Sequence, residues 1–130
     1  MAKTEFQGEG FRVQTEIRPG HLRAFVFDGA DSLAVSLAYW THLREQCRQT
    51  GQRNLLVVEN LVPAHVGEEE FNALIAAMVG MGYQELRVAF VSLQAPLQTN
   101  EQGMILGNEQ GLTLMAFSSE SVAERWIRFA

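Results

Sequence analysis

The sequence predicts an α/β protein with a single mixed, mostly parallel sheet of about five strands, an N-terminal hairpin and about four helices. Three observations support this prediction. Residues 11–18 alternate between apolar and polar side chains, which is typical of a strand with one solvated face. Short apolar runs at 55–58 and 88–91 are typical of strands that are covered on both faces. Segments with helical periodicity separate these strands, and helical crossovers favour parallel pairing.

The chain is expected to begin with a flexible lead-in over residues 1–10, which are polar and contain two glycines. A single domain would then occupy residues 11–130. Pro19-Gly20 predicts a tight turn, because proline presets φ and glycine tolerates positive φ. Residues 22–28 would form the returning strand of the hairpin.

The first predicted helix follows this hairpin and ends near Gly51. Its apolar positions recur at helical spacing, at Leu33, Leu37, Trp40, Leu43 and Cys47. Tyr39 and Trp40 are adjacent and point in different directions on a helix, so we expect one of them to be partly exposed. Asp28 and Asp31, the only aspartates, suit turn and capping roles before this helix.

The second predicted helix ends at Gly80 and Gly82, which can adopt left-handed capping conformations. Its apolar face consists of Phe71, Leu74, Ile75, Met78 and Val79. A third helix around residues 98–106 is consistent with the pattern, although Gly103 weakens it because glycine has a low helix propensity.

The last strand is predicted over residues 112–117, and a helix follows it. Ser118 is the expected N-cap, with Phe117 and Val122 positioned for a hydrophobic staple. The core face of this helix would consist of Val122, Ala123, Trp126 and Ile127.

The composition argues against several classes of function. Ten basic and 15 acidic residues give a net charge of −5, and the basic residues are scattered. Nucleic acid is therefore a disfavoured partner, since it requires clustered positive charge. No segment approaches the roughly 20 apolar residues of a membrane span, and the N-terminus does not resemble a signal peptide. We expect a cytoplasmic, reduced protein that does not insert into membranes.

Three segments carry a resemblance to a known family. They are LLVVENL at 55–61, LRVAFVS at 86–92 and LMAFSSESVAERWI at 114–127. In this order the chain resembles the STAS-like superfamily, including its stand-alone SpoIIAA-like branch, from about residue 11 to residue 129. The resemblance implies the fold described above and a role in protein–protein interaction.

One family motif is missing from the sequence. Anti-sigma-factor antagonists of this family carry an Asp-Ser-Ser-Gly-like stretch at the start of the second helix, and phosphorylation of its serine releases the partner. The matching residues 62–67 read VPAHVG, and the chain has no serine or threonine between Gly51 and Val91. The resemblance therefore implies a binding module without a serine phospho-switch.

Candidate catalytic and metal-binding residues are few. His65 precedes three glutamates at 68–70, and this group could act as a base or as a metal ligand. The simpler interpretation is that the glutamates oppose the positive end of a helix dipole. His21 and His42 lie on other elements without ligand-like spacing, so we expect no metal and no cofactor. Cys47, the only cysteine, lies on an apolar helix face and suits a core position.

These observations favour a non-catalytic binding or regulatory module, with an enzyme as the least favoured class. Its surface would consist of the second helix and the loops at 62–67 and 94–102. Ligands bind open α/β sheets at the carboxyl ends of the strands, which these loops follow. The candidate residues are Pro63, His65, Val66, Glu69, Met78, Met81, Tyr83, Pro96 and Leu97. The methionines and Tyr83 can also form the rim of a core, and this is the favoured interpretation of them. The expected partner is a protein, and a homodimer is one form of it. The alternative is a small carrier of an apolar, lipid-like ligand held between the sheet and the second helix.

Overall fold

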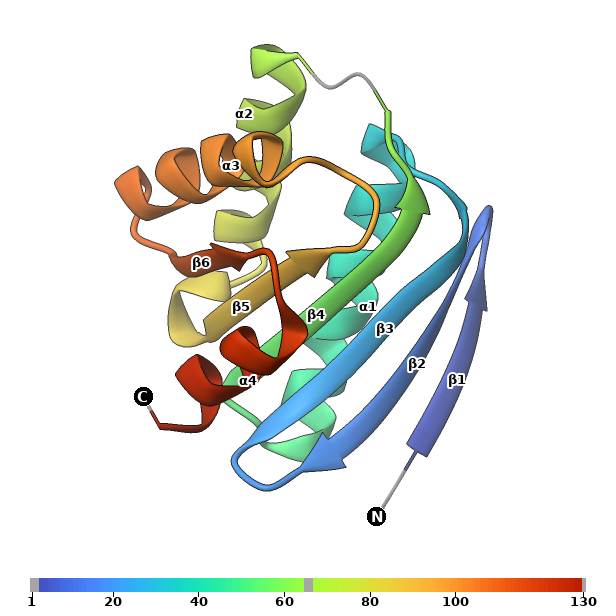
Figure 1. The fold of residues 1–130 in the computed structure, drawn as a ribbon, viewed down its shortest axis with the longest axis vertical. Helices are drawn as coiled ribbons and strands as arrows, with labels where there is room; N and C mark the ends of the chain where they lie inside the picture. Colours follow the sequence, from blue (N-terminus) through green and yellow to red (C-terminus); the bar gives the residue numbers. More distant parts are fainter. Residues whose placement is uncertain (1–2, 65–66, 130) are drawn as a thin grey trace.

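The chain forms one mixed sheet with helices on both faces, in a computed structural model that describes residues 3–64 and 67–129 (Figure 1). The six strands of this part lie in sequence order across the sheet. They are β1 (Lys3–Gly8), β2 (Phe11–Arg18), β3 (His21–Ala30), β4 (Asn54–Val62), β5 (Arg87–Ser92) and β6 (Thr113–Phe117). The helices are α1 (Leu33–Thr50), α2 (Glu68–Gly80), the short 3₁₀ helix η1 (Tyr83–Glu85), α3 (Leu97–Glu109) and α4 (Glu120–Arg128). The α/β class, the mostly parallel sheet and the N-terminal hairpin are confirmed. Among the described residues, no helix has the length and apolarity that crossing a membrane requires.

The strand β1 corrects the expected lead-in. Residues 3–8 pair antiparallel with β2, from Lys3 opposite Glu16 to Gly8 opposite Phe11. This edge strand is mostly exposed, so it lacks the alternating apolar pattern by which a strand is recognised. Its one aromatic residue, Phe6, stacks on His42 of α1 with ring centroids 4.0 Å apart.

The parallel half of the sheet determines where the helices lie. Strands β3 to β6 are parallel neighbours in chain order, so the three crossovers all step in the same direction. Right-handed connections then place α1, α2 and α3 on one face. The final helix α4 follows the last strand and packs on the other face, opposite α1 (Figure 1).

The side-chain alternation of β4 divides the core between these two faces. Leu55, Val57 and Leu61 belong to the larger core cluster beneath α1, α2 and α3. Leu56 and Val58 belong to the smaller cluster beneath α4. The apolar run at 55–58 is therefore covered on both faces, as the sequence predicts.

The helix α1 is buried on two sides, which corrects the expectation for its adjacent aromatics. Tyr39 is 1% exposed and Trp40 is 4% exposed. Tyr39 points toward β4, whereas Trp40 makes an edge-to-face contact with Tyr83 of η1 at 5.6 Å between ring centroids. Because α2 and η1 pack beside α1, both directions are covered. The buried face of α1 therefore differs from the predicted one, and Leu33 and Leu37 are only half-buried.

Two helix details also differ from expectation. The helix α3 extends from Leu97 to Glu109 despite Gly103, because that glycine lies against the ring of Phe71 on α2. In α4 the N-cap is Ser119 instead of Ser118. Val122 is exposed because it lies on the outer side of the helix, so it is not part of the core.

Candidate functional site

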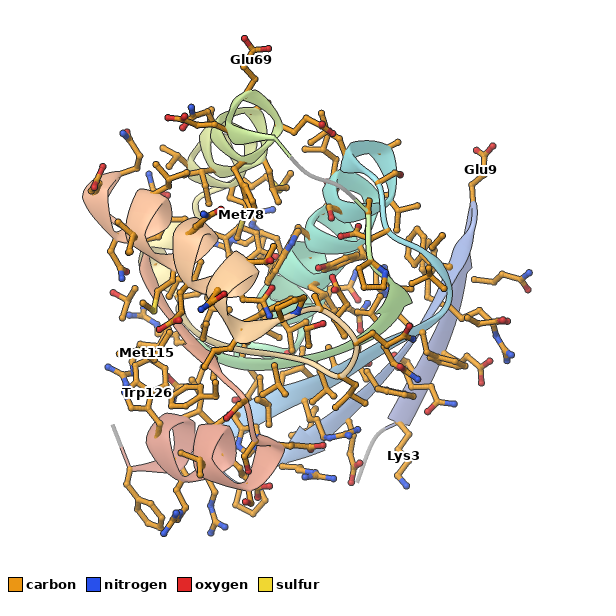
Figure 2. All side chains as sticks on the ribbon, turned by 45° about the horizontal axis from the view of Figure 1, so that its top comes forward. Lys3, Glu9, Glu69, Met78, Met115 and Trp126 are labelled. Carbon is orange, nitrogen blue, oxygen red and sulfur yellow. The ribbon has the colours of Figure 1, made fainter. Side chains whose placement is uncertain are left out.

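A cavity lies between the sheet and the helices α1, α2 and α3, and its volume is about 140 Å³. It lies toward the carboxyl ends of the parallel strands. Its walls are mainly apolar and include Trp40, Phe71, Leu74, Met78, Phe90 and Met104. In Figure 2, Met78 is labelled in the region between α2 and α3. An apolar cavity of ~150 Å³ is large enough to bind benzene.

Small residues leave this space open. Ala95, Gly103 and Ala116 line the cavity from the loop before α3, from α3 and from β6. At Gly103 a Cβ atom would lie 3.2 Å from Cε1 of Phe71, which is tight for a van der Waals contact. The absence of this atom lets α2 and α3 approach each other at one point while the neighbouring cavity stays unfilled.

Glu59 forms the polar end of the cavity. It follows Leu55 and Val57 on the same side of β4, so its side chain enters the helix layer, and it is only 5% exposed. The hydroxyl of Tyr39 donates a 2.6 Å hydrogen bond to its Oε2. Burial raises the pKa of Glu59 to about 7, and the negative charge of Asp31 adds to this shift, while the Tyr39 hydrogen bond opposes it.

Asp31 lies beside this pair, in the turn between β3 and α1. Its Oδ1 accepts hydrogen bonds from the Ser36 hydroxyl at 2.7 Å and from the Ser32 backbone N–H at 2.8 Å. Ser32 is the N-cap of α1, so Asp31 supports the cap as the sequence suggests. Burial raises the pKa of Asp31, while both hydrogen bonds lower it. Its backbone N–H donates to the carbonyl of Val62, which joins the ends of β3 and β4.

The residues that the sequence singled out are only partly brought together. Pro63, Met78 and Pro96 line the cavity. Glu69 is exposed in the first turn of α2, and Leu97 is the half-buried first residue of α3. His65 and Val66 lie outside the described residues.

Met81 and Tyr83 lie elsewhere, at the opposite end of α2. The carbonyl of Met81 accepts hydrogen bonds from Arg44 and Arg48 of α1. Tyr83 is buried, and its hydroxyl donates to the carbonyl of Trp40 at 2.5 Å. Met78 and Tyr83 are core residues, in agreement with the alternative that they belong to the rim of a core.

The polar residues of the cavity were not identified from the sequence as a site. Glu59 does carry a signal, because it is a charged residue within the apolar stretch LLVVENL of a central strand. A buried carboxylate requires a partner. This requirement points to a second polar group on the covering helices. Tyr39 of the first helix is such a polar group.

Other candidate groups have structural roles or lack a partner. Burial raises the pKa of the Cys47 thiol to about 11, so Cys47 is a core residue and a poor nucleophile. His21 is fully buried, and its Nε2 has no hydrogen-bond partner among the described residues. Within residues 3–64 and 67–129, no three His, Cys, Asp or Glu side chains are grouped to hold a metal ion.

The comparisons with known proteins add no identification. A scan of the sequence against models of known families finds no match, and a search of curated proteins finds none either. The STAS-like relationship therefore stays a prediction that depends on the order of elements and on the three sequence segments.

Proposed function

We propose that this protein is a non-catalytic binding domain that holds a small, largely apolar molecule in the cavity between the sheet and α1, α2 and α3. The supporting observation is the cavity itself, which has apolar walls and a polar end formed by Tyr39 and Glu59. Ligand sites generally combine apolar walls with a few placed polar groups. In open α/β sheets they also lie at the carboxyl ends of the strands.

The volume restricts the size of the ligand. At about 140 Å³ the cavity accommodates one ring-sized apolar group. This size supports a smaller ligand than the lipid-like molecule expected from the sequence. The position between the sheet and α2 agrees with that earlier hypothesis.

A titration with toluene, followed by amide chemical shifts in the isotope-labelled protein, tests this proposal. We expect saturable shifts at cavity residues such as Leu74 and Phe90. The variant Ala116→Phe places a ring in the cavity and should abolish them. Met115→Phe is the matched control on the same strand, because Met115 is exposed and is not part of the cavity wall. Identical shifts in wild type and Ala116→Phe would contradict binding in this cavity.

A second candidate function is self-association through the surface at the carboxyl ends of the central strands, beside the cavity. Val62 and Leu93 are each 55% exposed, at the ends of the adjacent strands β4 and β5. Exposed apolar residues grouped on a surface can mark an interface. The two exposed side chains support a protein partner on this side of the molecule, and a homodimer is one form of it.

Sedimentation equilibrium over a range of protein concentrations tests this second candidate. A dimer should dissociate in Leu93→Glu and persist in Ile105→Glu, because Ile105 on α3 is 53% exposed and serves as a matched control. A monomer at all concentrations, or a dimer that both variants retain, would contradict this interface.

A further inference from the structure

We propose that the ligand of the cavity is a small organic cation, a primary amine with one ring-sized apolar group, whose ammonium group pairs with Glu59. Its ring would lie among Trp40, Phe71 and Phe90. This inference rests on the proposed function, because it specifies the chemistry of the ligand at the same site.

The charge of the cavity wall favours a cationic ligand. Three carboxyl groups contribute to the cavity wall, those of Asp31, Glu59 and Glu70. No Lys, Arg or His among the described residues lines it. The buried guanidinium of Arg44 lies on α1 but is directed to Glu85 and to the carbonyl of Met81, at the other end of α2. An anionic ligand would therefore meet like charges, whereas a cation would be attracted.

The hydrogen bonding of Glu59 leaves one carboxylate oxygen for a ligand. Among the described residues, the Tyr39 hydroxyl is the only hydrogen-bond donor to this carboxylate, and it binds Oε2. The other oxygen, Oε1, remains able to accept from a ligand. An ionised carboxylate in an apolar environment is costly unless a charge partner and hydrogen bonds compensate it. The ammonium group of a primary amine supplies both.

Aromatic side chains form part of the cavity wall. Trp40 and Phe90 lie next to each other, with ring centroids 5.9 Å apart, and Phe71 also lines the cavity from α2. Aromatic faces attract cations and pack against aromatic rings. The wall therefore suits both parts of an arylalkylamine, the ring by packing and the cationic end by charge.

The helix termini exert an opposing effect. The N-termini of α1, α2 and α3 lie at the carboxyl ends of the parallel strands, on the side of the cavity. Each carries about half a positive elementary charge, which would favour an anion. Two of these ends already have carboxylates. Asp31 accepts from the backbone N–H of Ser32 at the start of α1, and residues 68–70 place three glutamates in the first turn of α2. The carboxylates carry more charge than the helix ends, so the balance favours a cation.

Three probes of nearly equal size test the inference by calorimetry at pH 8 and low salt. They are 2-phenylethylamine, 2-phenylethanol and phenylacetate. We expect the wild type to bind the amine at least about tenfold more tightly than the alcohol, as for a charge-assisted hydrogen bond. Phenylacetate should bind most weakly.

The variant Glu59→Gln should reduce the ratio of the amine affinity to the alcohol affinity to about one, because the neutral amide retains the size of the side chain without its charge. Glu109→Gln is the matched control, since it makes the same charge change at an exposed position at the end of α3. It should leave the ranking of the probes unaltered.

The pH dependence supplies an independent readout. Glu59 must be ionised to pair with the ammonium group, so the affinity for the amine should rise as pH increases from 5.5 through about 7. Asp31 and Glu70 face the same cavity, as does the Tyr39 hydroxyl, whereas α3 contributes the neutral Thr99 and Asn100. At pH 6, binding should release a proton in wild type and not in Glu59→Gln. Calorimetry in two buffers with different ionisation heats measures this release.

The outcomes separate the two proposals. Equal affinities for the amine and the alcohol, or tightest binding of phenylacetate, would overturn the cation assignment and leave the binding cavity in place. A preference for the amine that survives in Glu59→Gln would also overturn it. Binding of toluene without binding of any of the three probes would overturn the cation assignment alone. If toluene and all three probes fail to bind, or if Ala116→Phe binds them as wild type does, both proposals fail.

Discussion

The hydroxyl of Tyr39 on α1 donates a 2.6 Å hydrogen bond to Oε2 of Glu59 on β4, and both residues are buried. This bond joins the first helix to a central strand at the polar end of the cavity. It also holds the carboxyl group in position at the edge where ligands would enter. Properties of the site should therefore depend on this pair.

Tyr39→Phe should raise the pKa of Glu59 above about 7, because the hydroxyl opposes the effect of burial. It should also destabilise the fold by roughly 1–3 kcal/mol, since a buried acceptor loses its donor. Carbon-detected NMR of the glutamate carboxyl groups measures the pKa, and urea denaturation measures the free energy of unfolding.

Tyr83→Phe is the control for this prediction. It removes another buried hydroxyl that is bonded to the backbone of α1, at the carbonyl of Trp40. We expect a similar loss of stability without a change in the pKa of Glu59. If both variants shift that pKa equally, the direct bond between Tyr39 and Glu59 is not its determinant.

The stability of the protein should fall as pH rises toward neutrality, through Glu59. Its pKa is raised from 4.5 to about 7 in the folded state, so the folded protein retains the proton longer than the unfolded chain. The stabilising contribution is complete below pH 4.5 and is lost as pH rises through about 7. This pKa shift corresponds to a decrease in the free energy of unfolding of about 3 kcal/mol at most.

Urea denaturation between pH 4.5 and 8 measures this effect. The difference in unfolding free energy between wild type and Glu59→Gln isolates Glu59 from groups that titrate in the same range. Asp31 contributes in the same direction, because burial raises its pKa as well. A difference that does not vary with pH would contradict the raised pKa of Glu59.

Gly103 should tolerate substitution poorly, although glycine is normally unfavourable within a helix. A Cβ atom at this position would lie 3.2 Å from Cε1 of Phe71, so the Phe71 ring or α3 must move to admit a larger side chain. We expect Gly103→Leu to destabilise the fold by about 1–3 kcal/mol through overpacking. Thermal unfolding measures this loss.

Gly80→Leu is the matched control in α2. A Cβ atom at Gly80 meets no other atom within 4 Å, so the gain in helix propensity should dominate. A small stabilisation of Gly80→Leu beside a clear destabilisation of Gly103→Leu is the expected pair of results. Equal stabilisation by Gly80→Leu and Gly103→Leu would show that the Phe71 ring moves aside at little energetic cost.

The fold was largely predictable from local patterns. The alternation over residues 11–18 and the apolar runs at 55–58 and 88–91 reflect burial on one face or on two, and burial determines strand position in the sheet. The strand β1 was missed because an exposed edge strand has no core-facing pattern. The burial of both Tyr39 and Trp40 was missed because it depends on a second helix packing beside the first.

The candidate site was less predictable, for a related reason. Glu59 and Tyr39 lie on different elements, and their contact depends on how α1 is placed over β4. Helical spacing does not specify that placement. The sequence pattern therefore points to residues 62–67 before the second helix, where candidate residues such as Pro63 and His65 are adjacent in sequence. The structure instead gathers carboxyl groups from a strand, a turn and a helix.

An ion pair joins α4 to the sheet beside the apolar contacts of Ala123 and Ile127. Arg23 of β3 donates two hydrogen bonds to Glu120, at 2.7 Å and 3.1 Å, and this pairing lowers the pKa of Glu120. Glu120→Gln should cost about 1 kcal/mol at pH 7, since the pair is partly exposed and screened by water.

The pH dependence of this effect has the opposite sign to that of Glu59. A lowered pKa contributes stability above the unfolded value of 4.5, and this contribution is lost as pH falls through the lower folded value. Unfolding free energies at pH 3 to 7 should therefore converge for wild type and Glu120→Gln at the acidic end. Glu45→Gln is the control, because its pair with Arg48 is exposed and 3.7 Å long, and it should change stability little. A cost at Glu120 that persists unchanged at low pH would show that the ion pair is not what stabilises α4.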